Sequence, residues 1–316
     1  MKQSNNVILS IIIISYNTKE LLKECIESII KNSKTPKLQN SKHQALGASY
    51  EIIVVDNNSK DGSVKMLNNL KLKIKNLKLK IIVNNDNLGF SKANNQGIKI
   101  ARGKYVLFLN PDTVIPKNTI PFMLNYMKRN FQVGAATCRV ELTDGTLDDA
   151  CHRGFPAPWN TFCHFSGLEK IFPHTKIFAG YSLGYLDLNR THEIDSCVGA
   201  FMLIPKKIGK EVDWWDEDYF WNGEDIDFCY RIKEKGYKIM FVPEVKIIHY
   251  KGASSGIKKT KSKASSATKR KIMLASTQAM RIFYQKHYRG KYSWPIEKLI
   301  FIGIKILEKL RVYQVK

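Results

Sequence analysis

The sequence predicts an α/β protein with an open, twisted and mainly parallel sheet that carries helices on both faces. Apolar, often β-branched runs at residues 7–14, 51–55 and 105–109 have the length and composition of fully buried parallel strands. Segments with helical periodicity separate these runs, and such alternation is typical of a doubly wound sheet. Small polar residues follow each run, as they do at the ligand-binding edge of such sheets.

The first strand, at residues 7–14, is followed by a helix with one apolar face. That face consists of Leu21, Leu22, Cys25, Ile26, Ile29 and Ile30. Residues 33–49 are polar and form an insertion before the second strand at 51–55. The lysine-rich segment 71–83 is interpreted as the end of a helix followed by a third strand.

The stretch 84–113 organises the rest of the chain. It contains a glycine-bearing loop, then a helix carrying Asn94 and Gly97, then the strand 105–109, which ends in Asn-Pro-Asp at 110–112. A carboxylate just past the carboxyl end of a buried strand lies where open α/β sheets bind ligands. Asp112 is therefore a candidate site residue, although Asn-Pro-Asp taken alone is also an ordinary turn.

A second polar cluster ends the strand at 51–55. It consists of Asp56, Asn57, Asn58 and Ser59. Because the carboxyl ends of parallel strands meet at one edge of the sheet, these side chains are also expected to face a ligand.

Beyond residue 112 the pattern changes. A helix is expected at 119–129 and strands at 133–140 and 197–204. The intervening segment, 141–192, is rich in Gly, Pro, His and aromatic residues and is poor core material. It predicts loops and short helices around a binding cleft.

Glu224 and Asp225 stand at the start of a predicted helix, where capping and the helix dipole alone would favour carboxylates. Five large aromatic residues precede them, however, which is too many for a simple turn. These are Trp214, Trp215, Tyr219, Phe220 and Trp221. A carboxylate walled by aromatic side chains suits a general base whose pKa is raised by desolvation.

The chain is strongly basic, with 51 Lys and Arg against 28 Asp and Glu and a formal charge of +23. Such charge favours an anionic partner: nucleic acid, a phosphorylated substrate or a membrane surface. Codon bias explains part of the excess equally well, because many of the lysines stand among Asn and Ile residues.

Cysteine usage and the N-terminal residues bear on the compartment. The six cysteines, among them Cys25 on the apolar face of a helix, form no CxxC pair and suggest neither a zinc site nor a disulfide framework. The first apolar run is only as long as a buried strand, so we expect no signal peptide and no membrane span. These features predict a reducing, cytoplasmic location.

The C-terminal part reads differently from the rest. Residues 257–271 are polybasic and serine-rich, a composition that resists packing. A helix is expected after residue 272, and a second helix, amphipathic and interrupted by charges, begins at Pro295. The second helix fits an interfacial helix or a domain-packing helix equally well. The basic segment beside it favours the inner face of the cell membrane.

Six segments together resemble a known family. They are SIIIISYN, VVDNNSKDGS, NLGFSKANNQG, FLNPDT, WNGEDIDFCYRIKEKGY and VPEVKIIHYKGASS, in this order and spacing. The series is similar to the family-2 inverting glycosyltransferases of the GT-A nucleotide-sugar-binding fold, and most similar to their bacterial rhamnosyltransferase-like branch. The resemblance implies a transferase domain at 1–256, with a nucleotide-sugar half at 1–112 and an acceptor half at 113–256. A basic linker and helices follow at 257–316.

The resemblance also implies roles for particular residues. Tyr16 lies near the nucleotide base and Asp56 hydrogen-bonds that base. Asp112 matches the last acid of the metal-binding DxD motif, Asp225 matches the catalytic base, and His249 falls where some relatives place another metal ligand. The further residues expected to bind substrate or nucleotide are Ser15, Asn17, Asn58, Gly89, Asn94, Asn95, Asn110, Arg153, Trp221 and Glu224.

Two departures from the family pattern stand out. Asn110 replaces the first acid of the DxD motif, which removes one charge from the metal site. Asn94 stands where relatives often have an arginine, so another group has to meet the diphosphate, and we assign this role to Arg153. The implied cofactor is Mg²⁺ or Mn²⁺, which can neutralise the charge that develops on a departing diphosphate.

The expected function is inverting transfer of a sugar, such as rhamnose, from a nucleoside-diphosphate sugar to a glycan or lipid-linked acceptor in cell-surface polysaccharide synthesis. A nucleotidyltransferase is the first alternative, but it would want a basic glycine-rich loop after the first strand. A nucleic-acid-binding protein would explain the charge, yet no helix-turn-helix, zinc or RNP signature appears, so no nucleic acid is expected as a partner. A basic membrane-binding protein is the third alternative.

Overall fold

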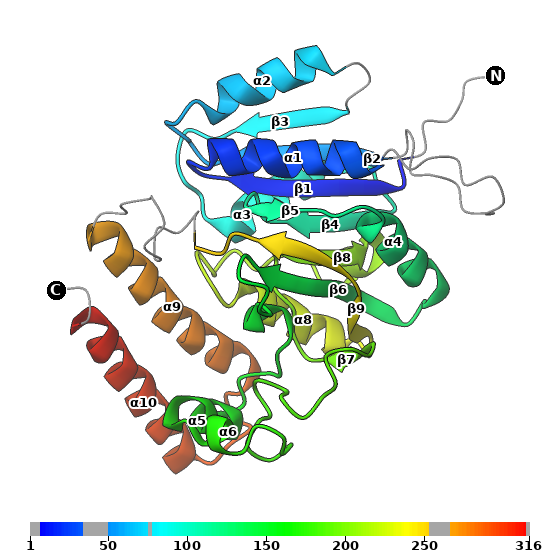
Figure 1. Ribbon diagram of the computed structural model, residues 1–316. Helices are drawn as coiled ribbons and strands as arrows, with labels where there is room; N and C mark the ends of the chain where they lie inside the picture. The colour runs from blue at the N-terminus through cyan, green and yellow to red at the C-terminus, as the bar shows by residue number, and fades with distance from the viewer. Residues whose placement is uncertain (1–6, 34–49, 75–77, 253–265, 314–316) are drawn as a thin grey trace.

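The computed structural model describes residues 7–33, 50–74, 78–252 and 266–313 (Figure 1). Its described strands form one nine-stranded sheet in the order β3-β2-β1-β4-β8-β6-β9-β5, with β7 paired to β9. The strands are β1 (Leu9–Ser15), β2 (Tyr50–Asp56), β3 (Leu79–Val83), β4 (Tyr105–Leu109), β5 (Thr113–Val114), β6 (Val133–Leu142), β7 (His192–Ile194), β8 (Phe201–Pro205) and β9 (Lys238–His249).

Helices separate strands in both halves of the chain, and α9 and α10 follow the last strand. They are α1 (Lys19–Ser33), α2 (Ser63–Lys73), α3 (Phe90–Ile100), α4 (Thr119–Arg129), the 3₁₀ turn η1 (Asp149–Cys151), α5 (Pro158–Ser166), α6 (Leu168–Ile171), α7 (Lys206–Glu211), α8 (Glu224–Glu234), α9 (Ser266–His287) and α10 (Trp294–Tyr313). The polar insertion expected at 33–49 lies almost wholly outside the described residues.

The parallel half of the sheet is β3-β2-β1-β4. Every residue of β1 is buried, as its β-branched composition predicts for a strand covered on both faces. Gly97 of α3 packs on the Ile12 side chain, because a Cβ there would lie 2.7 Å from the Ile12 Cγ2 atom. Figure 1 shows α1 in front of β1. The predicted helix-covered α/β half is confirmed.

The second half of the sheet is mixed. Strand β8 runs antiparallel to β4 and β6, whereas β6 and β9 are parallel. The strand expected at 197–204 begins later, at Phe201, so that expectation is wrong by four residues. The segment before it turns instead, with the Phe201 N–H donating to the Val198 carbonyl at 3.4 Å, and Gly199 packs closely on Phe90.

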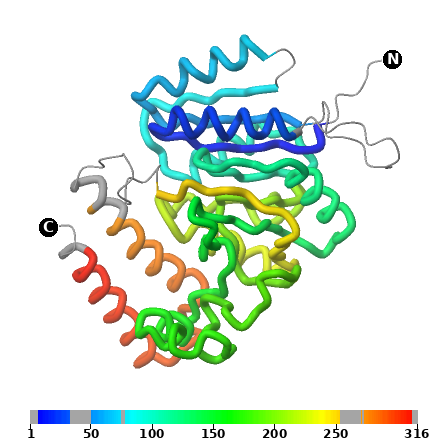
Figure 2. The backbone as a smooth tube through the Cα atoms, viewed as in Figure 1, coloured from blue at the N-terminus to red at the C-terminus, as the bar shows by residue number. Residues whose placement is uncertain are grey.

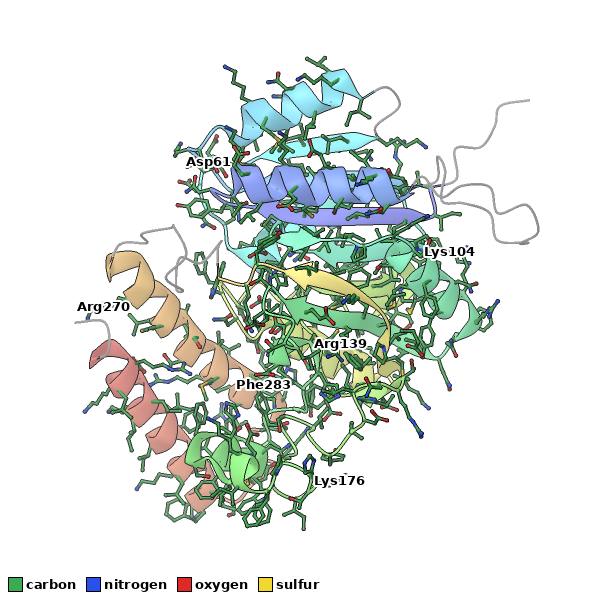
Figure 3. All side chains as sticks on the ribbon, in the orientation of Figure 1. Asp61, Lys104, Arg139, Lys176, Arg270 and Phe283 are labelled. Carbon is green, nitrogen blue, oxygen red and sulfur yellow. The ribbon has the colours of Figure 1, made fainter. Side chains whose placement is uncertain are left out.

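Helices α9 and α10 pack against each other as an antiparallel pair beside the sheet (Figures 1 and 2). An aromatic cluster joins α9 to α8 and to the loop before α8; it consists mainly of Tyr219, Tyr230, Phe283, Tyr284 and Tyr288. Figure 3 labels Phe283 on the inner side of this pair. Of the segment 257–271, which is expected to resist packing, residues 257–265 lie outside the described residues. Helix α9 begins at Ser266, earlier than the helix expected after residue 272.

No described helix is long and apolar enough to cross a membrane. The amphipathic helix expected from Pro295 is present as α10, which starts one residue earlier. All six cysteines are buried and free of disulfides, as their spacing predicts.

Candidate active site

A cavity of about 1090 Å³ opens at the carboxyl ends of β1 and β4 and continues between the C-terminal helices. It brings together residues that lie more than 200 positions apart in the sequence. The predicted site residues that line it are Tyr16, Gly89, Asn110, Asp112, Arg153, Trp221, Glu224, Asp225 and His249. The predicted site residues thus gather at the carboxyl edge of the sheet, as expected from their positions just after the strands.

One end of the cavity is lined by Tyr16, Asn57, Asn87 and Gly89. The Asn57 amide donates to the Gly89 carbonyl at 3.1 Å and to Asn87 Oδ1 at 3.3 Å, which ties the loop after β2 to the loop before α3. Gly89 has φ of +82°, and a Cβ there would lie 2.8 Å from the Phe220 carbonyl oxygen. Glycine is thus required at this position by both conformation and space.

Asp56 lies fully buried beneath this end and does not itself line the cavity. Its Oδ1 accepts a hydrogen bond from the Ser59 N–H at 2.8 Å, while its Oδ2 has no hydrogen-bond partner among the described residues. A buried carboxylate oxygen left without a donor is costly unless a ligand satisfies it. This arrangement fits the role that the resemblance implies for Asp56, a hydrogen bond to the nucleobase of the donor.

Several other predicted residues make hydrogen bonds within the loops around the cavity and do not line the cavity itself. Asn17 Oδ1 accepts from the Lys60 N–H at 2.7 Å, and Asn58 Oδ1 accepts from the Lys60 ammonium at 2.6 Å. The Ser15 hydroxyl lies 3.1 Å from that of Thr18. These contacts shape the first strand-helix turn and its neighbour.

The two asparagines of α3 also face away from the cavity lining. Asn94 donates to the Phe90 carbonyl of its own helix at 3.0 Å. Asn95 donates to the Trp215 carbonyl and to Glu217 Oε1, both at 2.9 Å, and so anchors the loop that leads to α8. Their place in the structure is consistent with support of the site rather than ligand contact.

Asp112, His249 and Asp148 form a buried chain that lines the cavity. His249 Nε2 lies 3.3 Å from Asp112 Oδ1, and its Nδ1 lies 2.9 Å from Asp148 Oδ2. Asp148 also pairs with Lys251. Burial alone would lower the pKa of His249, but the two carboxylates outweigh it and raise the pKa to about 9.

These residues fit part of a metal site. A carboxylate behind one ring nitrogen of a histidine orients the other nitrogen, as metal-ligating histidines require, and here that nitrogen faces Asp112. Asn110 Nδ2 lies 3.5 Å from the same nitrogen. Within the described residues, no group of three or more His, Cys, Asp or Glu side chains is arranged to hold a metal ion. Phosphate oxygens and water would have to complete the coordination.

Asp225 forms an ion pair with Arg153, whose Nη2 donates to Asp225 Oδ2 at 2.7 Å. Asp225 Oδ1 accepts from the Ile226 N–H at 2.9 Å. The ion pair requires the carboxylate form of Asp225, which is the form that a general base needs. Arg153, assigned from the sequence to the diphosphate, thus lies against the predicted base.

Glu224 is the neighbouring carboxyl and has a different environment. Burial, with the charge of Asp225 next to it, raises the pKa of Glu224 to about 8. Its Oε2 is buried without a hydrogen-bond partner in the described part of the chain. The two adjacent carboxyls thus lie in different environments: Asp225 is paired with Arg153, whereas burial favours the neutral form of Glu224.

The aromatic residues before α8 divide into two groups. Trp221 lines the cavity. Trp215 is instead buried in the main core, with its ring 4.8 Å from those of both Phe108 and Phe228, and Trp214 lies beside them. The expectation that both tryptophans wall the base is wrong, because the apolar strand β4 offers them a core to fill.

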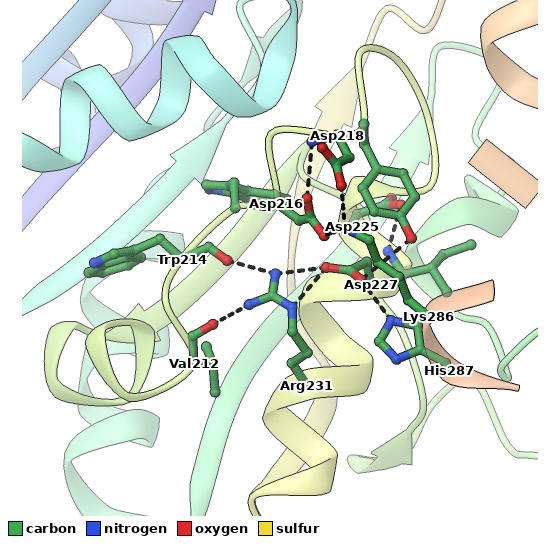
Figure 4. Close-up of polar contacts among 12 residues, drawn as sticks. Val212, Trp214, Asp216, Asp218, Asp225, Asp227, Arg231, Lys286 and His287 are labelled. Atoms are coloured by element: carbon green, nitrogen blue, oxygen red, sulfur yellow. Dashed lines mark hydrogen bonds and ion pairs between the residues drawn. The ribbon is translucent and has the colours of Figure 1, made fainter. Parts of the chain in front are cut away.

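Helix α9 is tied to α8 two residues beyond Asp225 (Figure 4). His287 Nε2 lies 2.7 Å from Asp227 Oδ1, and Arg231 binds Asp227 Oδ2 at 2.7–2.8 Å. Lys286 pairs with Asp216 and Asp218 in the preceding loop. The C-terminal helices therefore hold the segment that carries the predicted base.

Sequence reasoning missed two parts of the site. Asp148 is one of two consecutive acids in a turn, and nothing in its local pattern separates it from an ordinary loop residue. The cavity lining contributed by α9 and α10 was also missed. The amphipathic pattern of α10 showed an apolar face but not what that face would cover.

Solved structures place the fold in the GT-A class of glycosyltransferases. The mannosyltransferase PcManGT of Pyrobaculum calidifontis, in complex with GDP-Man and Mn²⁺, matches 97% of this chain and 72% of its own length with a TM-score of 0.57 at 15% identity. GalNAc-T7 with UDP, GalNAc and Mn²⁺ has a TM-score of 0.55 at 18% identity, over 78% of this chain and 44% of its own. At these identities the likeness shows the fold alone.

The chain belongs to glycosyl transferase family 2, whose sequence profile matches residues 10–188. It is 25% identical to the rhamnosyltransferase WbbL of Escherichia coli over 63% of this chain and 82% of that protein. It is 33% identical to the poly(ribitol-phosphate) beta-glucosyltransferase of Bacillus spizizenii over 47% of this chain, but that match spans only 20% of the relative's length. The protein is therefore a glycosyltransferase, as the sequence resemblance implied.

Proposed function

We propose that this glycosyltransferase uses a nucleoside-diphosphate sugar and inverts the configuration of the transferred sugar in one displacement, with Asp225 as the general base. One observation carries the proposal: a single cavity joins Asp225, the Asp112–His249 pair and the Tyr16 end. Donor, leaving group and acceptor can thus occupy one continuous space.

The reaction needs a base on the acceptor side and charge stabilisation on the donor side. Asp225 accepts the proton of the attacking hydroxyl, while Arg153 holds the carboxylate in place. Asp112 and His249 would hold Mg²⁺ or Mn²⁺, which when bound neutralises negative charge on the leaving diphosphate. Asp56, Tyr16 and the loops after β1 and β2 position the nucleotide.

The acceptor is a hydroxyl of a glycan or a lipid-linked saccharide in cell-surface polysaccharide synthesis, with rhamnose as one candidate donor sugar. Relatives in the curated set support this assignment: one is named a rhamnosyltransferase, one a poly(ribitol-phosphate) glucosyltransferase and one, from Staphylococcus epidermidis, a poly-beta-1,6-N-acetyl-D-glucosamine synthase. No observation favours a nucleotidyltransferase or a nucleic-acid-binding protein over this assignment.

Peripheral contact with an anionic membrane, on the cytoplasmic side, belongs to the same proposal. The net charge of +23 supports it, as do large apolar side chains exposed along α10. Trp294 is 73% exposed and Leu299 67%, and Ile302, Ile306 and Leu310 are also exposed.

The test is an assay of nucleoside diphosphate release with a panel of nucleotide sugars, with Mn²⁺ and with EDTA. We expect one donor to be turned over faster than the rest, and EDTA to abolish the activity. Asp112→Ala should abolish transfer and weaken donor binding in the same assay. Full activity in EDTA would remove the metal from the proposal, and no turnover of any nucleotide sugar with any saccharide acceptor would overturn the function itself.

A further inference from the structure

The active-site cavity has a second, apolar arm that the chemistry above does not use. It extends from the Asp225 region between α9, α10 and α5, and it is lined there by Phe162, Phe165, Phe283, Ile300, Ile304 and Leu307. Phe283 and Ile304 are both 4% exposed. A wall of aliphatic and aromatic side chains suits a hydrocarbon chain better than a sugar or a diphosphate, whose polar groups would lose hydrogen bonds to water there.

Gly303 makes room in this arm. It lines the cavity from α10, and a Cβ built at this glycine meets no heavy atom within 4 Å. Glycine inside a helix costs about 0.5–1 kcal/mol relative to alanine. No close neighbour forces a glycine here, and its position on the cavity wall leaves the arm wider than any other residue would.

The mouth of the arm carries several exposed apolar side chains, beside the exposed polar residues His164 and Ser166 of α5. Phe162, Phe165, Ile296 and Leu299 line the cavity and are nevertheless exposed, by 42–67%. Exposed apolar side chains at a cavity mouth favour contact with a hydrocarbon chain or a lipid surface.

The same arm contains a cation. Arg311 lines the cavity, and its guanidinium donates to the Ser276 hydroxyl at 2.9 Å. Among the described residues no carboxylate lies within ion-pair distance of it. Burial lowers the pKa of Arg311, and an anionic group would offset the cost of that burial. A phosphate matches the planar guanidinium well.

We infer that the apolar arm between α5, α9 and α10 binds the hydrocarbon chain of a lipid phosphate that carries the acceptor saccharide, with Arg311 as the cation for its phosphate. The inference rests on the proposed glycosyl transfer and specifies its acceptor. It assigns α9 and α10 to substrate binding rather than to membrane contact alone.

The experiment uses the full chain and farnesyl monophosphate as the probe, kept below its micelle concentration, with inorganic phosphate as the chain-free control. Binding is measured by calorimetry for wild type and for a graded series, Gly303→Ala, Gly303→Leu and Gly303→Phe. The matched control is Ile302→Phe, which adds the same ring on the exposed side of the same helix. Thermal midpoints check that each variant folds.

We expect wild type to bind farnesyl monophosphate at least tenfold more tightly than inorganic phosphate. Affinity should fall with the size of the side chain at 303, by tenfold or more for phenylalanine, while Ile302→Phe stays within twofold of wild type. Arg311→Gln should weaken binding as well, by about tenfold for a lost charge-assisted hydrogen bond.

Equal affinity of Gly303→Phe and wild type would overturn the inference, and so would equal affinity for farnesyl monophosphate and inorganic phosphate. Tighter binding by Ile302→Phe with no effect at 303 would place the probe on the outer face of α10, which also overturns it. The proposed glycosyl transfer is decided separately by the nucleotide-sugar panel, so the two can fail independently.

Discussion

Two consecutive residues, Glu224 and Asp225, carry the same chemical group in opposite settings. Asp225 is bound by Arg153, whereas Glu224 has a buried oxygen without a described donor and a raised pKa. When two neighbouring carboxyls lie in such different environments, one can act as a proton acceptor while the other stays neutral. The assignment of the base can therefore be tested on this pair.

Asp225→Asn keeps the size of the side chain and can still accept the Ile226 hydrogen bond, but it cannot take a proton. We expect kcat to fall by about 10²–10⁴-fold with nucleotide affinity retained. Glu224→Gln should reduce kcat by less than about tenfold, because a protonated glutamic acid and glutamine are close in shape and charge. Near-normal turnover in Asp225→Asn, with Glu224→Gln inactive, would reverse the assignment.

The raised pKa of Glu224 also makes stability depend on pH. The folded protein holds the proton up to about pH 8, whereas the ordinary pKa is 4.5, so between these values the folded state binds more protons than the unfolded state. This contribution to the free energy of unfolding is complete below about pH 4.5 and is lost as the pH rises towards 8.

We expect Glu224→Gln to flatten that loss and to be more stable than wild type at pH 8. Urea unfolding at pH 5, 6.5 and 8 would measure it. Glu234→Gln, which removes an exposed carboxylate at the far end of α8, is the control and should follow wild type at every pH. Parallel curves for all three proteins would contradict a buried neutral Glu224.

At the scale of elements, α9 and α8 act as one unit. The buried Asp227 joins them, with His287 on one oxygen and Arg231 on the other. Because Asp225 lies two residues earlier on the same helix, the position of this proposed base depends on a helix that follows it by about 60 residues.

His287→Ala should cost about 2–3 kcal/mol in the free energy of unfolding, since the buried Asp227 Oδ1 would lose its short contact with the imidazole and keep only the 3.4 Å hydrogen bond from the Tyr219 hydroxyl. Lys286→Ala is the matched control on the same helix. Its ion pairs are part exposed and should contribute less than about 1 kcal/mol. Urea unfolding measures both variants. Equal decreases in the free energy of unfolding would show that the buried His287–Asp227 pair stabilises the protein no more than the part-exposed pairs of Lys286.

The elements also show what the sequence could and could not predict. Strand β4 and helix α4 have the predicted bounds, because strong periodicity and clear breakers such as Pro111 mark them. The start of β8 and the packing of Trp214 and Trp215 against the core depend on partners far along the chain. Asp148 escaped notice for the same reason, since its importance lies in its contact with His249.

At the scale of the whole molecule, charge and exposed apolar surface occur together. The chain carries +23, and α10 exposes a row of large apolar side chains. A protein with both positive charge and an exposed apolar helix face can bind an anionic bilayer in two ways. Electrostatic attraction to the lipid head groups is weakened by salt, whereas burial of apolar side chains in the bilayer is not.

Vesicles rich in anionic lipid should therefore retain the protein at low ionic strength and release most of it as salt is added. Basic residues near the surface contribute about 1 kcal/mol each at most. Part of the basic segment at 258–271 lies outside the described residues. Its contribution to vesicle binding is measured by replacing its lysines with glutamine. Equal partitioning at low and high salt, or none at either, would leave the positive charge as ordinary solvated surface.

The docking of α9 on α8 has a consequence for the order in which the protein is made. Translation delivers the whole sheet and α8 before α9 and α10, and N-terminal units begin to fold first. Until α9 emerges, Tyr219 and Tyr230 have no cover and Asp227 has no histidine partner. A nascent chain paused at this stage would display an aromatic patch beside its future active site, a surface suited to chaperones and prone to aggregation.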